Sequence, residues 1–303
     1  MLKHQIIGTI NLSVPLIIVA LSYPNLLINT WCRIICALAT GLYLLFLNYK
    51  TTKQQAASLT YSPTEAALAD FEAMITACNV DPKSIQLRYS YSNEGIAQTM
   101  FNTITIDPLL WQGSENDPSG AKVKAILEEH IVPPVPAAQK ERMRATYDLL
   151  SLPVQRFIFK HELGHVVSKY GYKKLVVIGI VGSLATYTGV AAALALQAYV
   201  HAPGVAAVFF GMFIGGCSDL LFTYASNFLF KLPEEKNADR FAIQHSSPEE
   251  IEAAAQFWED HAQILAQHPN PTTIFSYLPT TIGSGYLPGP ARAAYLRQHG
   301  KTC

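Results

Sequence analysis

The chain has 303 residues, enough for one large domain or two, and its 22 basic residues balance its 22 acidic ones. This neutral balance offers no basic surface for nucleic acid, so a nucleic-acid partner is not expected. Only 15% of the residues are charged, against about a quarter in soluble domains. The composition therefore argues against an ordinary soluble protein and favours one embedded in a lipid bilayer.

Residues 1–50 contain two apolar runs, from about Ile6 to Ser22 and from about Trp31 to Leu47. An apolar helix of about 20 residues crosses a bilayer, so the pair predicts a transmembrane hairpin. Alternatively, the first run is a cleaved signal peptide, because Lys3 precedes it and Ala20-Leu21-Ser22 resembles a cleavage site. The second run follows so closely that the hairpin explains both runs at once.

Residues 51–174 are more polar and predict part of a folded domain outside the membrane. A helix is expected after Ser62-Pro63, because apolar residues then recur at helical spacing. A strand is expected at 85–91, where apolar and polar residues alternate, and a second at about 96–106. Helices with a small sheet make this an α+β domain.

A helix starting near Pro153 carries the pentapeptide His161-Glu162-Leu163-Gly164-His165. Two histidines four residues apart project from one helix face, so both can bind one zinc ion. Glu162 would lie beside the open metal position, where it can take a proton from zinc-bound water as that water attacks a carbonyl. The pentapeptide predicts peptide-bond hydrolysis, although a surface helix with two unrelated histidines would carry the same residues.

Two further apolar runs predict a second transmembrane hairpin over residues 175–230. The first continues from Leu175 to about Val200 without a charge, and the second from Gly204 to about Phe230 is interrupted only by Asp219. A carboxylate at this depth is costly unless it faces a cavity or a hydrogen-bonding neighbour, and both alternatives stay open.

Lysine and arginine residues near the ends of the spans predict the orientation. The opposite loops hold only Arg33. By the positive-inside rule, both termini and the histidine helix face the cytoplasm or the cytosolic side of an internal membrane. The residues on this side are Lys3, Lys50, Lys53, Lys169, Lys173, Lys174, Lys231, Lys236 and Arg240.

The last segment, 231–303, offers a third zinc ligand. Pro233 opens a helix in which Glu235 and Asp239 share a face one turn apart. Glu235 could complete a site with two histidines, and Asp239 could accept a ring N–H from one of them. An acidic first turn stabilised by the helix dipole is the alternative.

The pentapeptide, two apolar spans and then Glu235-Lys236-Asn237-Ala238-Asp239 resemble the HtpX and CAAX prenyl endopeptidase type of integral-membrane zinc protease. The pattern of this family is H-E-x-x-H followed by E-x-x-x-D. The resemblance covers the layout of nearly the whole chain and implies four transmembrane helices with a zincin-like cytoplasmic domain of the gluzincin type. It also implies one zinc ion per chain, bound by His161, His165 and Glu235, with Glu162 as general base and Asp239 supporting a ligand.

Members of this family often carry His-Pro, with an arginine a few residues later, near the C-terminus. Here Leu287 stands where the histidine is expected, and His268-Pro269 lies too far upstream to align simply. Arg292 fits the arginine and is a possible substrate or oxyanion contact.

The substrate is expected to bind as an added strand along residues 96–106, because an exposed sheet edge holds an extended peptide through backbone hydrogen bonds. The alternative is a buried central strand that packs Ile104 and Ile106 into the core. The residues proposed to lie along the substrate are Thr99, Phe101, Thr103 and Thr105.

These features predict a membrane-anchored zinc metalloendopeptidase that cuts peptides or proteins on the cytosolic side, for quality control or processing of membrane proteins. A catalytically silent zinc-binding scaffold is one alternative, disfavoured because Glu162 is present and structural zinc sites more often use four protein ligands. An intramembrane-cleaving metalloprotease is another, disfavoured because Lys160 and Lys169 flank the histidines. The sequence assigns no oligomeric state.

Overall fold

The computed structural model describes residues 30–58, 62–63, 65–89, 97–106, 145–146, 148–201, 204–267 and 286–301. The chain forms two compact units, each assembled from two separate segments. One unit contains Met1–Gln55 with Tyr172–Leu229, and the other contains Ala56–Gly171 with Phe230–Cys303. The described part of the chain is mostly helical, with one small sheet.

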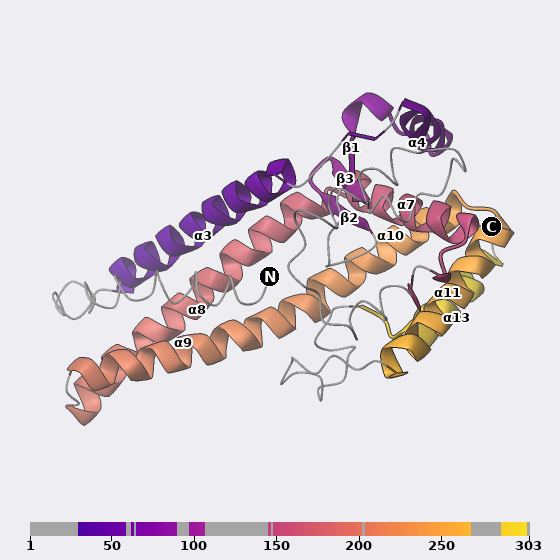
Figure 1. Cartoon of the computed structure of the whole chain (residues 1–303). Helices are drawn as coiled ribbons and strands as arrows, with labels where there is room; N and C mark the ends of the chain where they lie inside the picture. Colours follow the sequence, from indigo (N-terminus) through magenta and orange to yellow (C-terminus); the bar gives the residue numbers. More distant parts are fainter. Residues whose placement is uncertain are drawn as a thin grey trace, which may run out of the picture. The chain divides into compact units, whose positions relative to one another are not determined.

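The first unit consists of long helices that pack closely (Figure 1). They are α3 (Thr30–Ser58), α8 (Tyr170–Val200) and α9 (Gly204–Ser226). A Cβ atom on Gly189 of α8 would lie 2.8 Å from the Gly211 carbonyl oxygen and 3.2 Å from the Gly215 Cα on α9. Small residues let the helix backbones approach, as is usual where lipid rather than water surrounds them.

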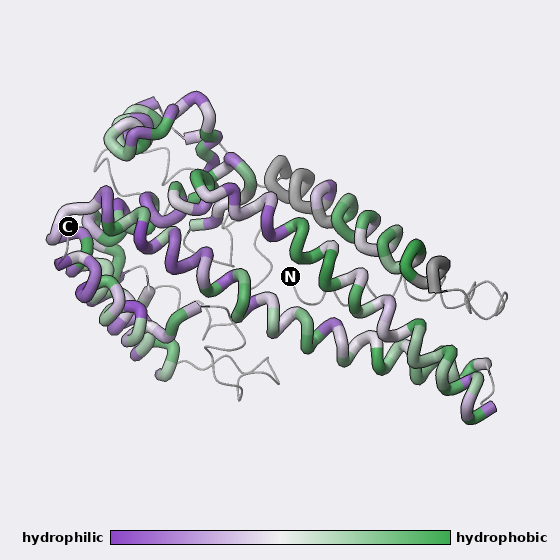
Figure 2. Tube along the Cα trace, turned by 180° about the vertical axis from the view of Figure 1, so that it is seen from behind, coloured by the Kyte–Doolittle hydropathy of each residue, from purple (hydrophilic) through white to green (hydrophobic). Residues whose placement is uncertain are grey.

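Two helices are long and apolar enough to cross a membrane, Tyr170–Val200 and the continuous helix Gly204–Gln244. Figure 2 shows hydrophobic residues along most of α8 and α9. Large apolar side chains on them are solvent-exposed, with Phe209 and Phe213 each 67% exposed. These features are weak evidence of membrane association, because length and composition alone define them.

The predicted count of four spans is not reached among the described residues. The first predicted span and the signal-peptide alternative lie outside them. The second falls within α3, where the apolar helical stretch Ala37–Leu47 is shorter than a span. The third and fourth correspond to α8 and α9.

The second unit contains a three-stranded sheet in the order β1-β3-β2. Its strands are β1 (Gln86–Tyr89), β2 (Ala97–Met100) and β3 (Thr103–Ile106). β3 is parallel to β1 and antiparallel to β2. The predicted strand at 96–106 is therefore two strands joined at Phe101, which has a positive φ of 55°.

This hairpin corrects the prediction for Thr103 and Thr105, two of the four residues proposed to lie along the substrate. β3 pairs on both sides, so Thr103 and Thr105 lie in the middle of the sheet and cannot accept an added strand. Ile104 and Ile106 are buried, as the alternative of a central strand expected. β1 and β2 are the outer strands of the described sheet, and β2, which contacts α7, carries Thr99.

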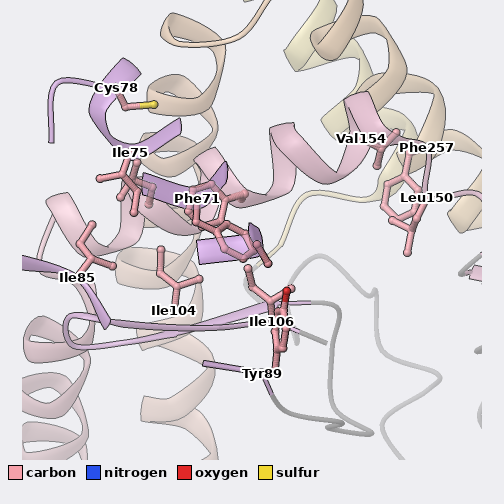
Figure 3. Packing of buried hydrophobic residues seen from close by; sticks show 13 residues of the cluster. Phe71, Ile75, Cys78, Ile85, Tyr89, Ile104, Ile106, Leu150, Val154 and Phe257 are labelled. Carbon is pink, nitrogen blue, oxygen red and sulfur yellow. The ribbon is translucent and has the colours of Figure 1, made fainter. Parts of the chain in front are cut away.

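The core of this unit lies between the sheet and the helices α4 (Glu65–Ala77) and α7 (Leu152–Val167). Phe71 and Ile75 of the predicted helix after Ser62-Pro63 pack with Ile104 (Figure 3). Phe159 belongs to the same cluster. The Phe71 and Phe159 rings are 5.0 Å apart between centroids. A second cluster joins α7 to α10 (Leu232–Gln244), α11 (Pro248–Gln267) and α13 (Gly289–Gly300).

Candidate metal centre

Helix α7 is the central element of the site. Ser151 precedes it in extended conformation and Pro153 occupies its first turn, where a missing N–H costs nothing. Helix α7 is packed between the sheet and the helices α10 and α11, so it is buried on nearly all sides. Its buried residues are Val154, Gln155, Phe157, Phe159, Lys160, His161, Glu162, Leu163, Gly164 and His165.

The two histidines and Glu235 converge on one point. His161 and His165 rings lie edge to face, 4.7 Å apart between centroids. The Glu235 Oε2 atom is 3.3 Å from His161 Nε2 and 3.5 Å from His165 Nε2. One ligand atom from each residue lies within 4.8 Å of the others, and all three residues are buried. Two imidazoles and a carboxylate at this spacing suit a zinc ion with one open coordination position.

Close contact between α7 and α10 brings Glu235 to the histidines. Gly164 faces α10, and a Cβ atom there would lie 3.0 Å from the Ala238 Cα and 3.1 Å from the Phe241 Cβ. Any larger residue at 164 would push against the α10 backbone. The glycine within the pentapeptide thus permits the third residue of the cluster to approach.

Asp239 and Arg292 support His161 from behind. The His161 Nδ1 atom is 2.8 Å from Asp239 Oδ1. The Arg292 guanidinium donates from Nε to Asp239 Oδ2 at 3.0 Å and from Nη2 to Oδ1 at 2.5 Å, and it stacks over the Trp258 ring. With Nδ1 held by a carboxylate, the His161 Nε2 atom is left to face Glu235 and a metal.

Without a metal, the electrostatics of the cluster favour the charged forms of His161, Glu235 and Asp239. Burial and Arg292 would each lower the pKa of His161, but Asp239 and Glu235 outweigh them and raise it to about 9. Against the effect of burial, the histidines hold the pKa of Glu235 well below its usual range. Burial would raise the pKa of Asp239, but Arg292 and His161 have the larger effect, so this pKa is also lowered. A metal that binds His161 must therefore displace a proton.

Glu162 lies beside this cluster on α7, 9% exposed. The Thr99 hydroxyl of β2 is 2.7 Å from Glu162 Oε2 and 2.9 Å from the Glu162 carbonyl oxygen. The sequence analysis placed Thr99 on a substrate strand and did not foresee this contact. No local pattern could have indicated it, because 63 residues separate the two side chains.

A buried ion pair fixes α7 from its other side. Lys160 Nζ is 2.7 Å from Glu250 Oε2, and both side chains are almost fully buried. Glu250 also accepts from the Ser247 N–H, while Ser247 Oγ accepts from the Glu250 N–H. This capping box begins α11, so one carboxylate both starts that helix and anchors the helix with the histidines. The Ser-x-x-Glu spacing in the sequence was the available signal.

Arg292 and the remaining predicted strand residues take different places from those expected. Arg292 is only 5% exposed, and its guanidinium donates to Asp239. It lines a pocket with Glu235 and Tyr286, together with Leu232, Lys236, Asp239 and Leu287. Phe101 lies in the hairpin turn, and Thr103 and Thr105 point to the sheet face opposite Ile104.

Aromatic rings pack beside the histidines. The Tyr170 ring lies 4.6 Å from the His165 ring and stacks on Phe230 at 5.8 Å between centroids. Burial and the negative charges of Glu235 and Glu162 raise the pKa of Tyr286, so its hydroxyl stays protonated at neutral pH. The Lys231 ammonium group lies over the Tyr286 ring, 3.8 Å from its centroid.

Residues 143–278 match the model of peptidase family M48, a stretch that contains α7 and α10. No curated protein and no solved structure matches the chain. The family match supports an M48 metallopeptidase, that is, a hydrolase whose substrate is a peptide or protein. Peptidases of this family are typically metal-dependent, which agrees with the cluster of His161, His165 and Glu235.

Proposed function

We propose that the protein is a membrane-anchored, zinc-dependent endopeptidase of the HtpX type that hydrolyses peptide bonds on the cytosolic side. The observation that carries this proposal is the convergence of His161, His165 and Glu235 within 4.8 Å, with Glu162 on the same helix. Quality control or processing of membrane proteins is the role we infer.

The donor set supports zinc in a catalytic site. Two histidine nitrogens and one carboxylate oxygen leave a fourth position open for water or substrate, whereas structural zinc sites are closed by four protein ligands. Glu235 Oε2 is buried and has no hydrogen-bond partner among the described residues, as expected for an atom that would bind a metal. These features disfavour the silent scaffold.

The residues of the chain divide the chemistry between them. Bound zinc would supply a Lewis acid that acidifies a water molecule and polarises the scissile carbonyl. Glu162 takes a proton from the attacking water and delivers it to the leaving amine, so that a carboxylate is regenerated. The unpaired edge of β2 holds the peptide extended beside α7.

Arg292 acts through Asp239, and we assign contact with the substrate carbonyl to Tyr286 instead. The Arg292 Nε and Nη2 atoms both donate to Asp239, and the side chain is buried. Tyr286 lines the same pocket as Glu235 and keeps a protonated hydroxyl, which can donate to a developing oxyanion. Leu287, one residue further on, stands at the family position usually held by histidine.

Membrane anchoring through α8 and α9 agrees with the exposed apolar side chains of these helices. Basic residues near both ends of this hairpin, Lys173, Lys174, Lys231 and Lys236, support a cytosolic location of the adjoining segments by the positive-inside rule. An intramembrane-cleaving protease is disfavoured, because α7 lies in the unit with the sheet and carries the buried ion pair of Lys160.

The test compares purified, detergent-solubilised protein with three variants on unfolded casein, with zinc content measured by elemental analysis after dialysis. Glu162→Gln keeps its zinc and loses roughly a hundredfold to ten-thousandfold of its cleavage rate, because proton transfer is removed. Glu235→Gln loses both zinc and cleavage. Glu234→Gln, the same change one residue earlier on α10, is the matched control and keeps its zinc.

Equal zinc content in Glu235→Gln and wild type would refute the ligand assignment. Cleavage by Glu162→Gln at the wild-type rate would refute the hydrolytic role of the site.

A further inference from the structure

The Thr99 hydroxyl connects the outer strand of the sheet to the carboxylate of Glu162. We propose that Thr99 is a positioning residue that holds Glu162 through Oε2, leaving Oε1 to accept the proton of the attacking water. This inference rests on the proposed function, since it assigns Glu162 as the base. It adds a requirement that neither the H-E-x-x-H motif nor the metal ligands impose.

The hydroxyl of Thr99 has two possible acceptors on Glu162, and the carboxylate oxygen Oε2 is the preferred one. The Thr99 hydroxyl carries a single proton, and both Glu162 Oε2 at 2.7 Å and the Glu162 carbonyl oxygen at 2.9 Å lie within reach. The carbonyl belongs to a helix and can accept from within α7, whereas a bond to a carboxylate is charge-assisted and stronger. The proton therefore goes to Oε2.

Glu162 depends on this bond for its orientation. Among the described residues, Thr99 is the hydrogen-bond donor to the Glu162 side chain. A glutamate has three side-chain torsions, and ordering such a side chain costs conformational entropy. A catalytic base that is displaced by about 1 Å can lose roughly a hundredfold in rate.

Thr99 is well suited to this task because its own position is fixed by β2. It pairs with Ile104 of β3, so both side chains lie on the sheet face that α7 covers. A β-branched side chain has few χ1 rotamers, which holds the hydroxyl in place. Backbone groups point along the sheet and side chains perpendicular to it. A peptide added to the free edge of β2 therefore does not compete with Thr99 for Glu162.

This geometry links substrate binding to the base. β2 is the strand proposed to hold the peptide, and the Glu162 carboxylate is tied to the same strand. Any shift of β2 on peptide binding moves Oε2 with it. The positioning effect should therefore be felt in kcat, because it changes the transition state, and little in KM.

The test uses the full-length protein in detergent with two substitutions at one position. Thr99→Val keeps the shape and removes the hydroxyl, and Thr99→Ser keeps the hydroxyl. We expect Thr99→Val to lower kcat by roughly 10- to 100-fold with KM within about twofold of wild type. Thr99→Ser restores most of kcat, and zinc content is equal in all. Thr76→Val removes a hydroxyl that bonds the Glu72 carbonyl on α4 and serves as the matched control.

A second readout needs neither metal nor activity. In metal-free protein, thermal unfolding of Thr99→Val, Glu162→Leu and the double variant tests whether the two side chains interact. The loss of Tm in the double variant is expected to be smaller than the sum of the single losses, because each substitution alone breaks the same bond. Additive losses overturn the inference.

The outcomes separate the two proposals. Absence of Glu162-dependent cleavage in wild type overturns the proposed function, and the positioning role falls with it. Cleavage that depends on Glu162 but is unchanged in Thr99→Val overturns the positioning role alone, as does a kcat that Thr99→Ser fails to restore.

Discussion

Replacing Asp239 by asparagine removes one charge from the metal centre and keeps the size of the side chain. The Asp239 carboxylate is 1% exposed, and it bonds His161 Nδ1 at 2.8 Å and two nitrogens of Arg292. Loss of such a partner lowers metal affinity by roughly 10- to 100-fold, because the ligand ring is no longer held. It also leaves the Arg292 guanidinium buried without its counter-charge, which lowers the free energy of unfolding by about 3 kcal/mol.

The same substitution changes how protons compete with zinc. The pKa of His161 is about 9, so at pH 7 the proton on that ring lowers zinc affinity by roughly a hundredfold. Asp239 is the largest influence that raises this pKa, and without it the proton competes little at pH 7. The two effects of Asp239→Asn thus oppose each other at pH 7. Near pH 9 only the loss of orientation remains, and the affinity deficit reaches its full size.

Zinc affinity would be measured by competition with a chromophoric chelator across this pH range. Glu259→Gln is the control, because Glu259 pairs with Arg297 at the exposed side of α11 and should leave the affinity unchanged. An affinity deficit of the same size at pH 7 and pH 9 would show that His161 is not protonated in the metal-free protein. Absence of any deficit at pH 9 would refute the supporting role of Asp239.

Three further predictions follow from the same contacts. In metal-free protein, the folded pKa of His161, about 9, lies above its ordinary value of about 6.5. Its contribution to stability, on the order of 3 kcal/mol, is therefore complete below about pH 6.5 and is lost as pH rises through 9, and a Tm that rises over this range contradicts the pairing. Gly164→Ala forces α7 from α10, which costs about 1–3 kcal/mol and lowers zinc content, whereas an unchanged zinc content would mean that α10 can move aside. Lys160→Met leaves Glu250 buried without its positively charged partner, which lowers the free energy of unfolding by about 3 kcal/mol while zinc stays bound. Arg297→Met breaks an exposed ion pair and should change Tm much less.

The sequence by itself determined the features that depend on local geometry. His161 and His165 lie on one face of a helix because the helical pitch returns every fourth residue to the same side. The helix α4 after Ser62-Pro63 is likewise confirmed by the structure, since its start signal and apolar spacing are local. The helix expected to open at Pro233 is present as α10, but it continues from α9 without a break. The two long apolar helices follow from composition in the same way.

The tertiary structure alone decided which distant residues meet. Glu235, which the sequence had named, reaches the histidines because α10 packs closely on α7 at Gly164. Arg292 bonds Asp239, and Thr99 bonds Glu162, across 53 and 63 residues of sequence. The strand at 96–106 divides into an edge strand and a central strand because β3 pairs on both sides. These contacts arise from packing between separate helices and strands. The residue pattern of one element does not indicate which residues of another element it will meet.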